Sequence, residues 1–133
     1  TIEKVIKECL VLERKPTDYE ISLSFVENKE IKELNREYRN VDRETDVLSF
    51  PIDEDFLVPV PLLGDIIISA EKALEQSIEY NHSLLREIAY LTAHSMFHLL
   101  GYDHMEEDEK INMRNKEKEV MKRLKIFKSG RED

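Results

Sequence analysis

The chain is poor in the residues that build cross-linked, membrane-embedded or phosphate-loop proteins. Among its 133 residues cysteine occurs once, at Cys9, which excludes an internal disulfide and a cysteine-rich metal cluster. Its three glycines form no glycine-rich phosphate loop. There is no run of 18 apolar residues and no secretory signal at the polar start of the sequence, so we expect a cytoplasmic protein without a membrane span.

Positive charge is also scarce. The chain carries 20 Lys and Arg against 29 Asp and Glu, a net charge of −9 at pH 7. This balance argues against broad, non-specific nucleic-acid binding, which relies on a positive surface, and no DNA partner is expected. A local basic patch in a cleft could still hold phosphate. The length and a hydrophobic content of 41% predict one globular domain, residues 1–133.

Hydrophobic periodicity predicts an α+β layered fold, with a small mixed sheet of three or four strands packed with about five helices. The predicted helices are 2–14, 29–38, 69–80, 83–100 and 107–125, and the predicted strands are 21–25, 46–52 and 65–68. Ser69 and Ser83 are expected to cap helices. Strand 65–68 is apolar without alternation, which is typical of a strand buried on both faces. Segment 53–63 is expected to be an irregular loop, and a candidate lid.

Helix 83–100 is apolar nearly all round, which is typical of a helix in the centre of a domain. Cys9 lies on the apolar stripe of the first helix, so we expect a buried, unreactive thiol. His82 precedes the central helix in a polar break, and we expect it at the surface and not as a metal ligand.

Three of the four histidines fall within eleven residues, at His94, His98 and His104. Residues four apart stand one above the other on a helix, and Gly101 is the residue type that most easily ends a helix in a left-handed turn. The turn would let His104 face the same point from the other side. Three imidazoles leave one tetrahedral position open, which indicates a catalytic zinc site with one ion per chain. The alternative is that these are core histidines whose nitrogens are satisfied by other groups.

Zinc in such a site lowers the pKa of its water to about 7, which suits hydrolysis of an ester, amide or phosphodiester. Candidates for accepting the second N–H of a ligating imidazole are Asp46, Asp65 and Asp103. The spacing also matches the metzincin proteases, but their glutamate base is replaced here by Ser95, which cannot take a proton from water at neutral pH. A zinc-dependent peptidase or small-molecule hydrolase is therefore the weaker alternative.

The run His94-Ser95-Met96-Phe97-His98-Leu99-Leu100-Gly101-Tyr102-Asp103-His104 resembles the H-G-x-L-H-L-x-G-Y-D-H signature of the YbeY family of bacterial rRNA-maturation endoribonucleases. Residues 34–39, 45–51 and 63–66 resemble three further blocks of that family, in the same order. The resemblance implies that the three histidines bind zinc or a similar divalent ion. It also implies cleavage of single-stranded rRNA or pre-rRNA, above all at the 3′ end of 16S rRNA, and a role in ribosome quality control at the small ribosomal subunit.

The same resemblance maps two catalytic residues of the family onto Arg39 and His94. A guanidinium is always charged and can grip phosphate with two parallel hydrogen bonds, although a surface ion pair of Arg39 with Asp42 or Glu44 is the alternative. The chain departs from the family in two respects: Ser95 replaces a glycine, and the strand that usually precedes the first helix is absent. A ribosome-assembly factor with a structural metal and no catalysis is a further alternative.

Overall fold

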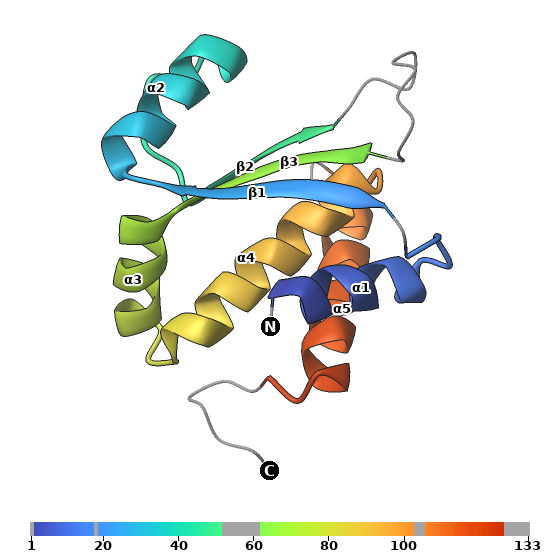
Figure 1. The fold of residues 1–133 in the computed structure, drawn as a ribbon. Coiled ribbons are helices and arrows are strands. Elements are labelled where there is room, and N and C mark those ends of the chain that lie inside the picture. Colours follow the sequence, from blue (N-terminus) through green and yellow to red (C-terminus); the bar gives the residue numbers. More distant parts are fainter. Residues whose placement is uncertain (1, 18, 52–61, 103–105, 127–133) are drawn as a thin grey trace.

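The computed structural model describes residues 2–17, 19–51, 62–102 and 106–126, and within them the predicted α+β fold is confirmed (Figure 1). The elements follow in the order α1 (Ile2–Leu12), β1 (Glu20–Val26), α2 (Asn28–Arg39), β2 (Val47–Pro51), β3 (Leu62–Ser69), α3 (Ala70–Glu79), α4 (Leu84–Leu99) and α5 (Glu107–Arg123). All eight were predicted, with boundaries that differ by a few residues. The candidate lid at 53–63 falls almost wholly outside the described residues.

The sheet is mixed and has the strand order β1-β3-β2. Strand β3 lies in the centre, parallel to β1 and antiparallel to β2. Its Ile66 and Ile68, which share one face, are fully buried, whereas Ile67 on the other face is only partly buried. The strand that was expected to be buried on both faces is therefore fully buried on one face only. The strand begins at Leu62, three residues before the predicted start, because its pairing with β1 continues to Leu62 opposite Glu20.

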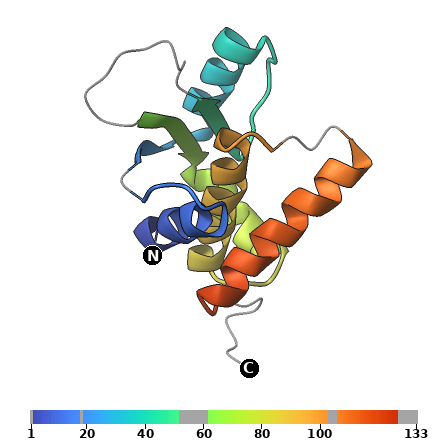
Figure 2. The same ribbon diagram turned by 90° about the vertical axis from the view of Figure 1, so that its right-hand side faces the viewer.

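The helices cover the sheet unequally. Helix α2 lies on one side of the sheet, and α4 lies on the other together with α1 and α5 (Figure 1). Both α1 and α5 pack against α4, as the turned view also shows (Figure 2). Helix α4 also contacts α3, β2 and β3, so it is the central helix that its apolar composition predicted. The core includes Val5, Cys9, Leu10, Ile66, Ile68, Met96, Phe97, Met113 and Val120.

Both ends of α4 are defined by local hydrogen bonds. Ser83 caps the start, where its hydroxyl accepts from the backbone N–H of Arg86 at 3.1 Å. At the other end Gly101 has φ 104°, and the N–H of Tyr102 donates to the carbonyl of Phe97 at 2.9 Å. This is a Schellman turn, and the rings of Phe97 and Tyr102 pack edge to face at 5.6 Å. The predicted glycine stop after His98 is therefore confirmed.

Two expectations about single residues have different outcomes. Cys9 is fully buried, as expected, and burial together with the charges of Glu8, Glu117 and Glu13 raises the pKa of its thiol. The surface position expected for His82 is wrong. Its side chain is only 7% exposed, and Nε2 lies 2.6 Å from Oε1 of Glu87. Glu87 is itself buried, and a buried carboxylate needs such a partner.

No helix within the described residues is long and apolar enough to cross a membrane.

Candidate active site

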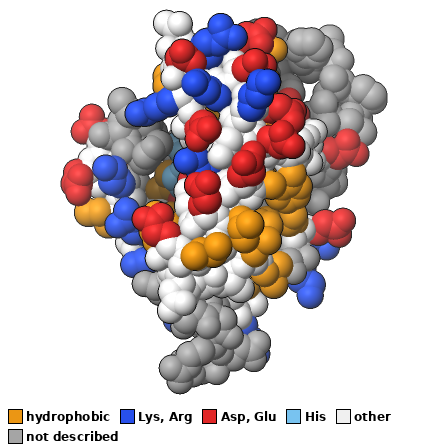
Figure 3. Space-filling view, turned by 90° about the vertical axis from the view of Figure 1, so that its left-hand side faces the viewer, with side chains coloured by type: hydrophobic (Ala, Val, Ile, Leu, Met, Phe, Trp, Pro, Cys, Tyr) orange, Lys and Arg blue, Asp and Glu red, His pale blue; other side chains and the backbone are white. Residues whose placement is uncertain are grey.

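A cleft of about 520 Å³ opens where α2 and the segment leading into β2 face the second half of α4. Three of the predicted site residues line it together: Arg39, His94 and His98. The fourth, His104, lies outside the described residues. In the space-filling view, histidine atoms are visible at the back of a hollow below the charged side chains of α2 (Figure 3). The fold therefore brings together residues that lie 55 or more positions apart in the sequence.

The two histidines occupy successive turns on one face of α4. Their ring centroids are 4.8 Å apart and the rings are nearly perpendicular, at 83°. Tyr90, one turn earlier, stacks on His94 with 6.2 Å between centroids. The spacing of four thus places the two imidazoles side by side at the cleft, as predicted.

The Nδ1 atom of His94 lies 2.6 Å from Oε2 of Glu117, a residue of α5 that is 2% exposed. The expected partners Asp46 and Asp65 do not take this position, and Asp103 lies outside the described residues. The signal for Glu117 is present in the sequence, because it follows Met113 by four residues and precedes Val120 by three. A glutamate on the apolar stripe of an otherwise polar helix is a candidate for a buried role.

Tyr90 holds the same carboxylate from a second side. Burial raises the pKa of the Tyr90 phenol, and the charge of Glu117 and a hydrogen bond to it raise that pKa further. The phenol therefore stays protonated at physiological pH, which makes it a donor to Glu117. This carboxylate is fixed between a phenol and an imidazole.

Arg39 is in the last turn of α2, and Ser49 and Phe50 hold its side chain. Nη2 donates to the backbone carbonyl of Ser49 at 2.6 Å, and the guanidinium carbon lies 5.6 Å from the centre of the Phe50 ring. The alternative of an ion pair with Asp42 or Glu44 is wrong, because no carboxylate in the described part of the chain is within ion-pair distance of Arg39. Glu44 pairs instead with Lys72, at 3.4 Å.

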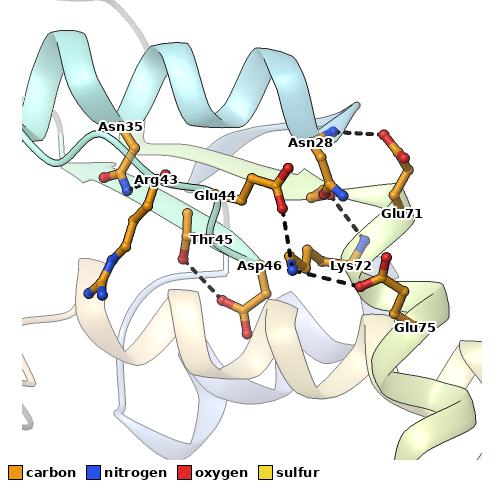
Figure 4. A network of polar contacts seen from close by, with 10 residues as sticks. Asn28, Asn35, Arg43, Glu44, Thr45, Asp46, Glu71, Lys72 and Glu75 are labelled. Atoms are coloured by element: carbon orange, nitrogen blue, oxygen red, sulfur yellow. Dashed lines mark hydrogen bonds and ion pairs between the residues drawn. The ribbon is translucent and has the colours of Figure 1, made fainter.

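The segment between α2 and β2 forms one wall of the cleft and is tied to both neighbouring helices (Figure 4). Asn35 donates through Nδ2 to the backbone carbonyl of Arg43 at 3.1 Å, and Glu44 reaches Lys72 on α3. Next to them the Thr45 hydroxyl donates to Oδ1 of Asp46 at 3.4 Å. These contacts set where Asp46 enters the cleft.

Ser95, which replaces the glycine of the expected motif, lies away from the cleft. It is fully buried among the helices, and its hydroxyl oxygen has no hydrogen-bond partner in the described residues. A side chain in that position cannot act on a substrate in the cleft. Ser95, which occupies the position of the metzincin glutamate, therefore does not act as a base in this cleft.

The described residues alone contain no group of three His, Cys, Asp or Glu side chains that could hold a metal ion, and the predicted third ligand His104 is not among them. What they do contain is a pair of imidazoles, two guanidinium groups and a carboxylate around one cleft. Imidazole and guanidinium side chains in one cleft are typical of an enzyme that acts on a phosphate ester. The class of protein indicated is a hydrolase.

The chain belongs to the YbeY endoribonuclease family, since the family model described as Endoribonuclease YbeY matches residues 1–125. It is 58% identical over 127 residues to the Endoribonuclease YbeY of Finegoldia magna, which covers 96% of this chain and 83% of that protein. The identity to the Endoribonuclease YbeY of Clostridioides difficile is 57% over 129 residues, and the alignment covers 94% of this chain and 84% of that protein. The solution structure of a Thermotoga maritima protein is similar, with a TM-score of 0.58, 27% identity and 92% and 81% of the two chains covered.

Proposed function

We propose that the chain is a metal-dependent endoribonuclease that cleaves single-stranded rRNA precursors, with the 3′ end of 16S rRNA as its main target and a role in ribosome quality control. The relatives at 55–58% identity are named as endoribonucleases. The observation that supports the proposal best is that Arg39, His94 and His98 line one cleft. Arg39 is the proposed phosphate-binding residue. His94 is a proposed metal ligand and a proposed catalytic residue.

Two imidazoles line the cleft, those of His94 and His98, and imidazole is a ligand type that zinc binds. We assign His94, His98 and His104 as its ligands. Nδ1 of His94 is engaged by Glu117, so coordination by this ring uses Nε2. A carboxylate behind a ligating imidazole fixes its orientation and raises its basicity, as in many zinc proteins. Zinc, when bound, supplies positive charge that polarises a phosphoryl oxygen or a water molecule.

Arg39 supplies the second charge that a phosphodiester requires. Its Nη2 donor is used by the Ser49 carbonyl, which holds the guanidinium plane at the cleft wall. The remaining N–H groups can donate to the non-bridging oxygens of a phosphate, where negative charge grows as the new bond forms. Arg43 lines the same cleft, so two cationic side chains face one carboxylate, that of Asp46, in a chain of net charge −9.

The test compares cleavage of a single-stranded rRNA fragment by the wild type, His98→Ala and Arg39→Ala. We expect both variants to lose on the order of 10²-fold in rate. Arg39→Ala removes a positive charge that stabilises the transition state, and His98→Ala removes a ligand of the ion that would supply the other. Arg36→Ala is the matched control, since it removes an exposed arginine from the same helix without touching the cleft. Equal cleavage by all four proteins would make the activity a contaminant and overturn the proposal.

The proposed partner is the small ribosomal subunit, whose precursor rRNA is the substrate. Catalysis and assembly are separated by removing the metal with a chelator. A catalytic role predicts that cleavage stops, and zinc restores it. A purely structural role in assembly predicts co-sedimentation with small subunits and no cleavage by either form.

A further inference from the structure

A second cavity, of about 370 Å³, lies between the first half of α4 and the helix α5. We call it the α4–α5 groove. The lining residues that carry a positive charge are Arg86, Arg114, Lys118 and Lys122. The one carboxylate in the lining, that of Glu117, is 2% exposed and contacts His94. The exposed charges of the groove are therefore positive.

The basic residues of α5 differ in whether a carboxylate neutralises them. On the side of α1, Lys116 pairs with Glu13 and Arg123 pairs with Glu8, both at 3.0 Å. The three basic residues of α5 that line the groove stand four residues apart, which places them in one row along the helix. None of the three is within ion-pair distance of a carboxylate in the described part of the chain. Like charges four apart on a helix repel each other, so an anion bound along this row would stabilise it.

The groove continues the line of the cleft along α4. Four side chains at intervals of four form one stripe of this helix: Arg86, Tyr90, His94 and His98. The first two line the groove and the last two line the cleft. From Arg86 to His98 the helix rises about 18 Å, at 1.5 Å per residue, so a strand bound across the histidines can reach the groove. Lys and Arg side chains border the hollow with the histidines on more than one side (Figure 3).

The chemistry of the groove suits the backbone of a single RNA strand. Cations at regular intervals match a row of phosphates, and single-strand sites combine such cations with surfaces that contact bases. The groove offers such a surface in Tyr90, Met121 and Ile126. The ligand class indicated is therefore an extended phosphodiester chain, and the cleft next to the groove indicates that this chain is the substrate itself.

We propose that the α4–α5 groove is a second RNA-binding site, which holds the substrate strand beyond the cleaved phosphate; this inference rests on the proposed function. Arg114, Lys118 and Lys122 each contact one phosphate. An RNA that fills only the cleft meets Arg39 and Arg43, whereas a longer strand meets the groove as well. The groove takes no part in breaking the bond, and it selects long substrates over short ones.

The test measures RNA binding by fluorescence anisotropy over a range of salt concentrations, in a His98→Ala parent that does not cleave. The labelled single strands have about 4 and about 16 nucleotides, the two ends of the usual range of site sizes. Each phosphate contact adds about −0.7 to the slope of log affinity against log salt, so three groove contacts should make the slope steeper for the long RNA by about 2.1. Lys118→Gln with Lys122→Gln should remove about 1.4 of this difference and leave the slope for the short RNA unchanged.

The matched control is Lys4→Gln with Lys15→Gln. It removes the same charge from exposed positions that line neither the cleft nor the groove, so the net charge of the chain changes equally. We expect it to bind both RNAs with the slopes of the parent. All four substituted lysines are exposed, so neither variant loses a buried contact.

The slopes and the cleavage reaction judge the two proposals separately. An unchanged slope for the long RNA in the groove variant overturns the groove, and so does an equal change in the control. With His98 intact, the groove variant should raise KM for a long single-stranded rRNA fragment at unchanged kcat. Cleavage with wild-type KM and kcat by that variant overturns this inference and leaves the proposed function standing. Absence of cleavage by the wild type overturns the proposed function.

Discussion

The proposed role of Glu117 depends on one contact, in which its Oε2 lies 2.6 Å from Nδ1 of His94. Replacing it with alanine removes the group that orients this imidazole. Loss of such a partner typically lowers metal affinity 10–100-fold, so we expect that decrease in zinc affinity for Glu117→Ala. Competition titration against a chromophoric chelator measures it. Glu119→Ala, a change at a partly exposed side chain on the same helix, should bind zinc as tightly as the wild type. Equal affinities of the two variants would contradict the assigned ligand set.

Cys9 predicts a pH dependence of stability. Its pKa is raised in the folded protein, first by burial and then by nearby carboxylates, so the folded state holds the thiol proton more tightly than the unfolded chain does. The stabilisation is complete below the unfolded pKa of about 8.5 and is lost as the pH rises above it, by at most about 1.4 kcal/mol per pH unit. Urea unfolding between about pH 8 and 10 should show this decline in the wild type and a flatter profile in Cys9→Ala. Parallel profiles would refute it.

At the residue scale, the sequence predicted the residues that stand in a motif and missed those whose role depends on burial. Arg39, His94 and His98 were found because their residue types carry chemistry and stand in a motif. Glu117 was missed although it lies on the apolar stripe of its helix, and His82 was misplaced because it stands among polar neighbours in the sequence. Only the packing of α5 on α4, and of the α3–α4 turn on Glu87, buries them. Burial of a polar side chain is a tertiary property, so one-dimensional patterns underestimate it.

At the scale of elements, the pairing of β2 with β3 joins the sheet to the end of α4. A Cβ atom added at Gly64 would lie 2.5 Å from the carbonyl oxygen of Phe50 and 2.8 Å from Cδ2 of Leu99. The backbone of β2 cannot move without shifting Ser49, which holds Arg39. The close approach of these two strands is therefore tied to the arginine in the cleft.

We expect Gly64→Ala to lower the free energy of unfolding by about 1–3 kcal/mol, the usual effect of an overpacked site. Urea denaturation measures the change. Ala70, exposed at the start of α3, offers a control, since Ala70→Ser alters a side chain of similar size without a buried contact. Unchanged stability of Gly64→Ala would mean that β2 can separate from β3 at this point.

The elements themselves were largely predictable. Periodicity located all five helices and three strands of the described chain, and the serine caps and the Gly101 stop set the ends of α3 and α4. The start of β3 was not, since Leu63 and Gly64 belong to the strand only through their pairing with neighbours. The pairing order β1-β3-β2 likewise depends on contacts distant in sequence and not on local preference.

For the whole molecule, a net charge of −9 limits how RNA is held. Two cationic side chains, Arg39 and Arg43, line the cleft among the described residues. Each phosphate contact to a single strand contributes about −0.7 to the slope of log affinity against log salt, so two contacts predict a shallow slope of about −1.4. Arg39→Ala and Arg43→Ala should each reduce its magnitude by about 0.7.

Fluorescence anisotropy with a short labelled single-stranded RNA, in a His98→Ala background that prevents cleavage, measures this slope. Arg36→Ala serves as the control and should leave it unchanged. A slope several times steeper would mean that the RNA follows a longer basic surface than the cleft provides. A slope near zero would mean that phosphate charge contributes little to binding.

The position of α1 has a consequence for synthesis of the chain. Residues 2–12 leave the ribosome well before α4 and α5, yet they pack against both of these helices. Until α4 and α5 have both been synthesised, the apolar stripe with Val5, Cys9 and Leu10 lacks the complete surface against which it packs. Contacts between the two ends of a chain form late and expose apolar surface while they wait. The nascent protein is therefore most exposed to aggregation and chaperone capture just before α5 is released.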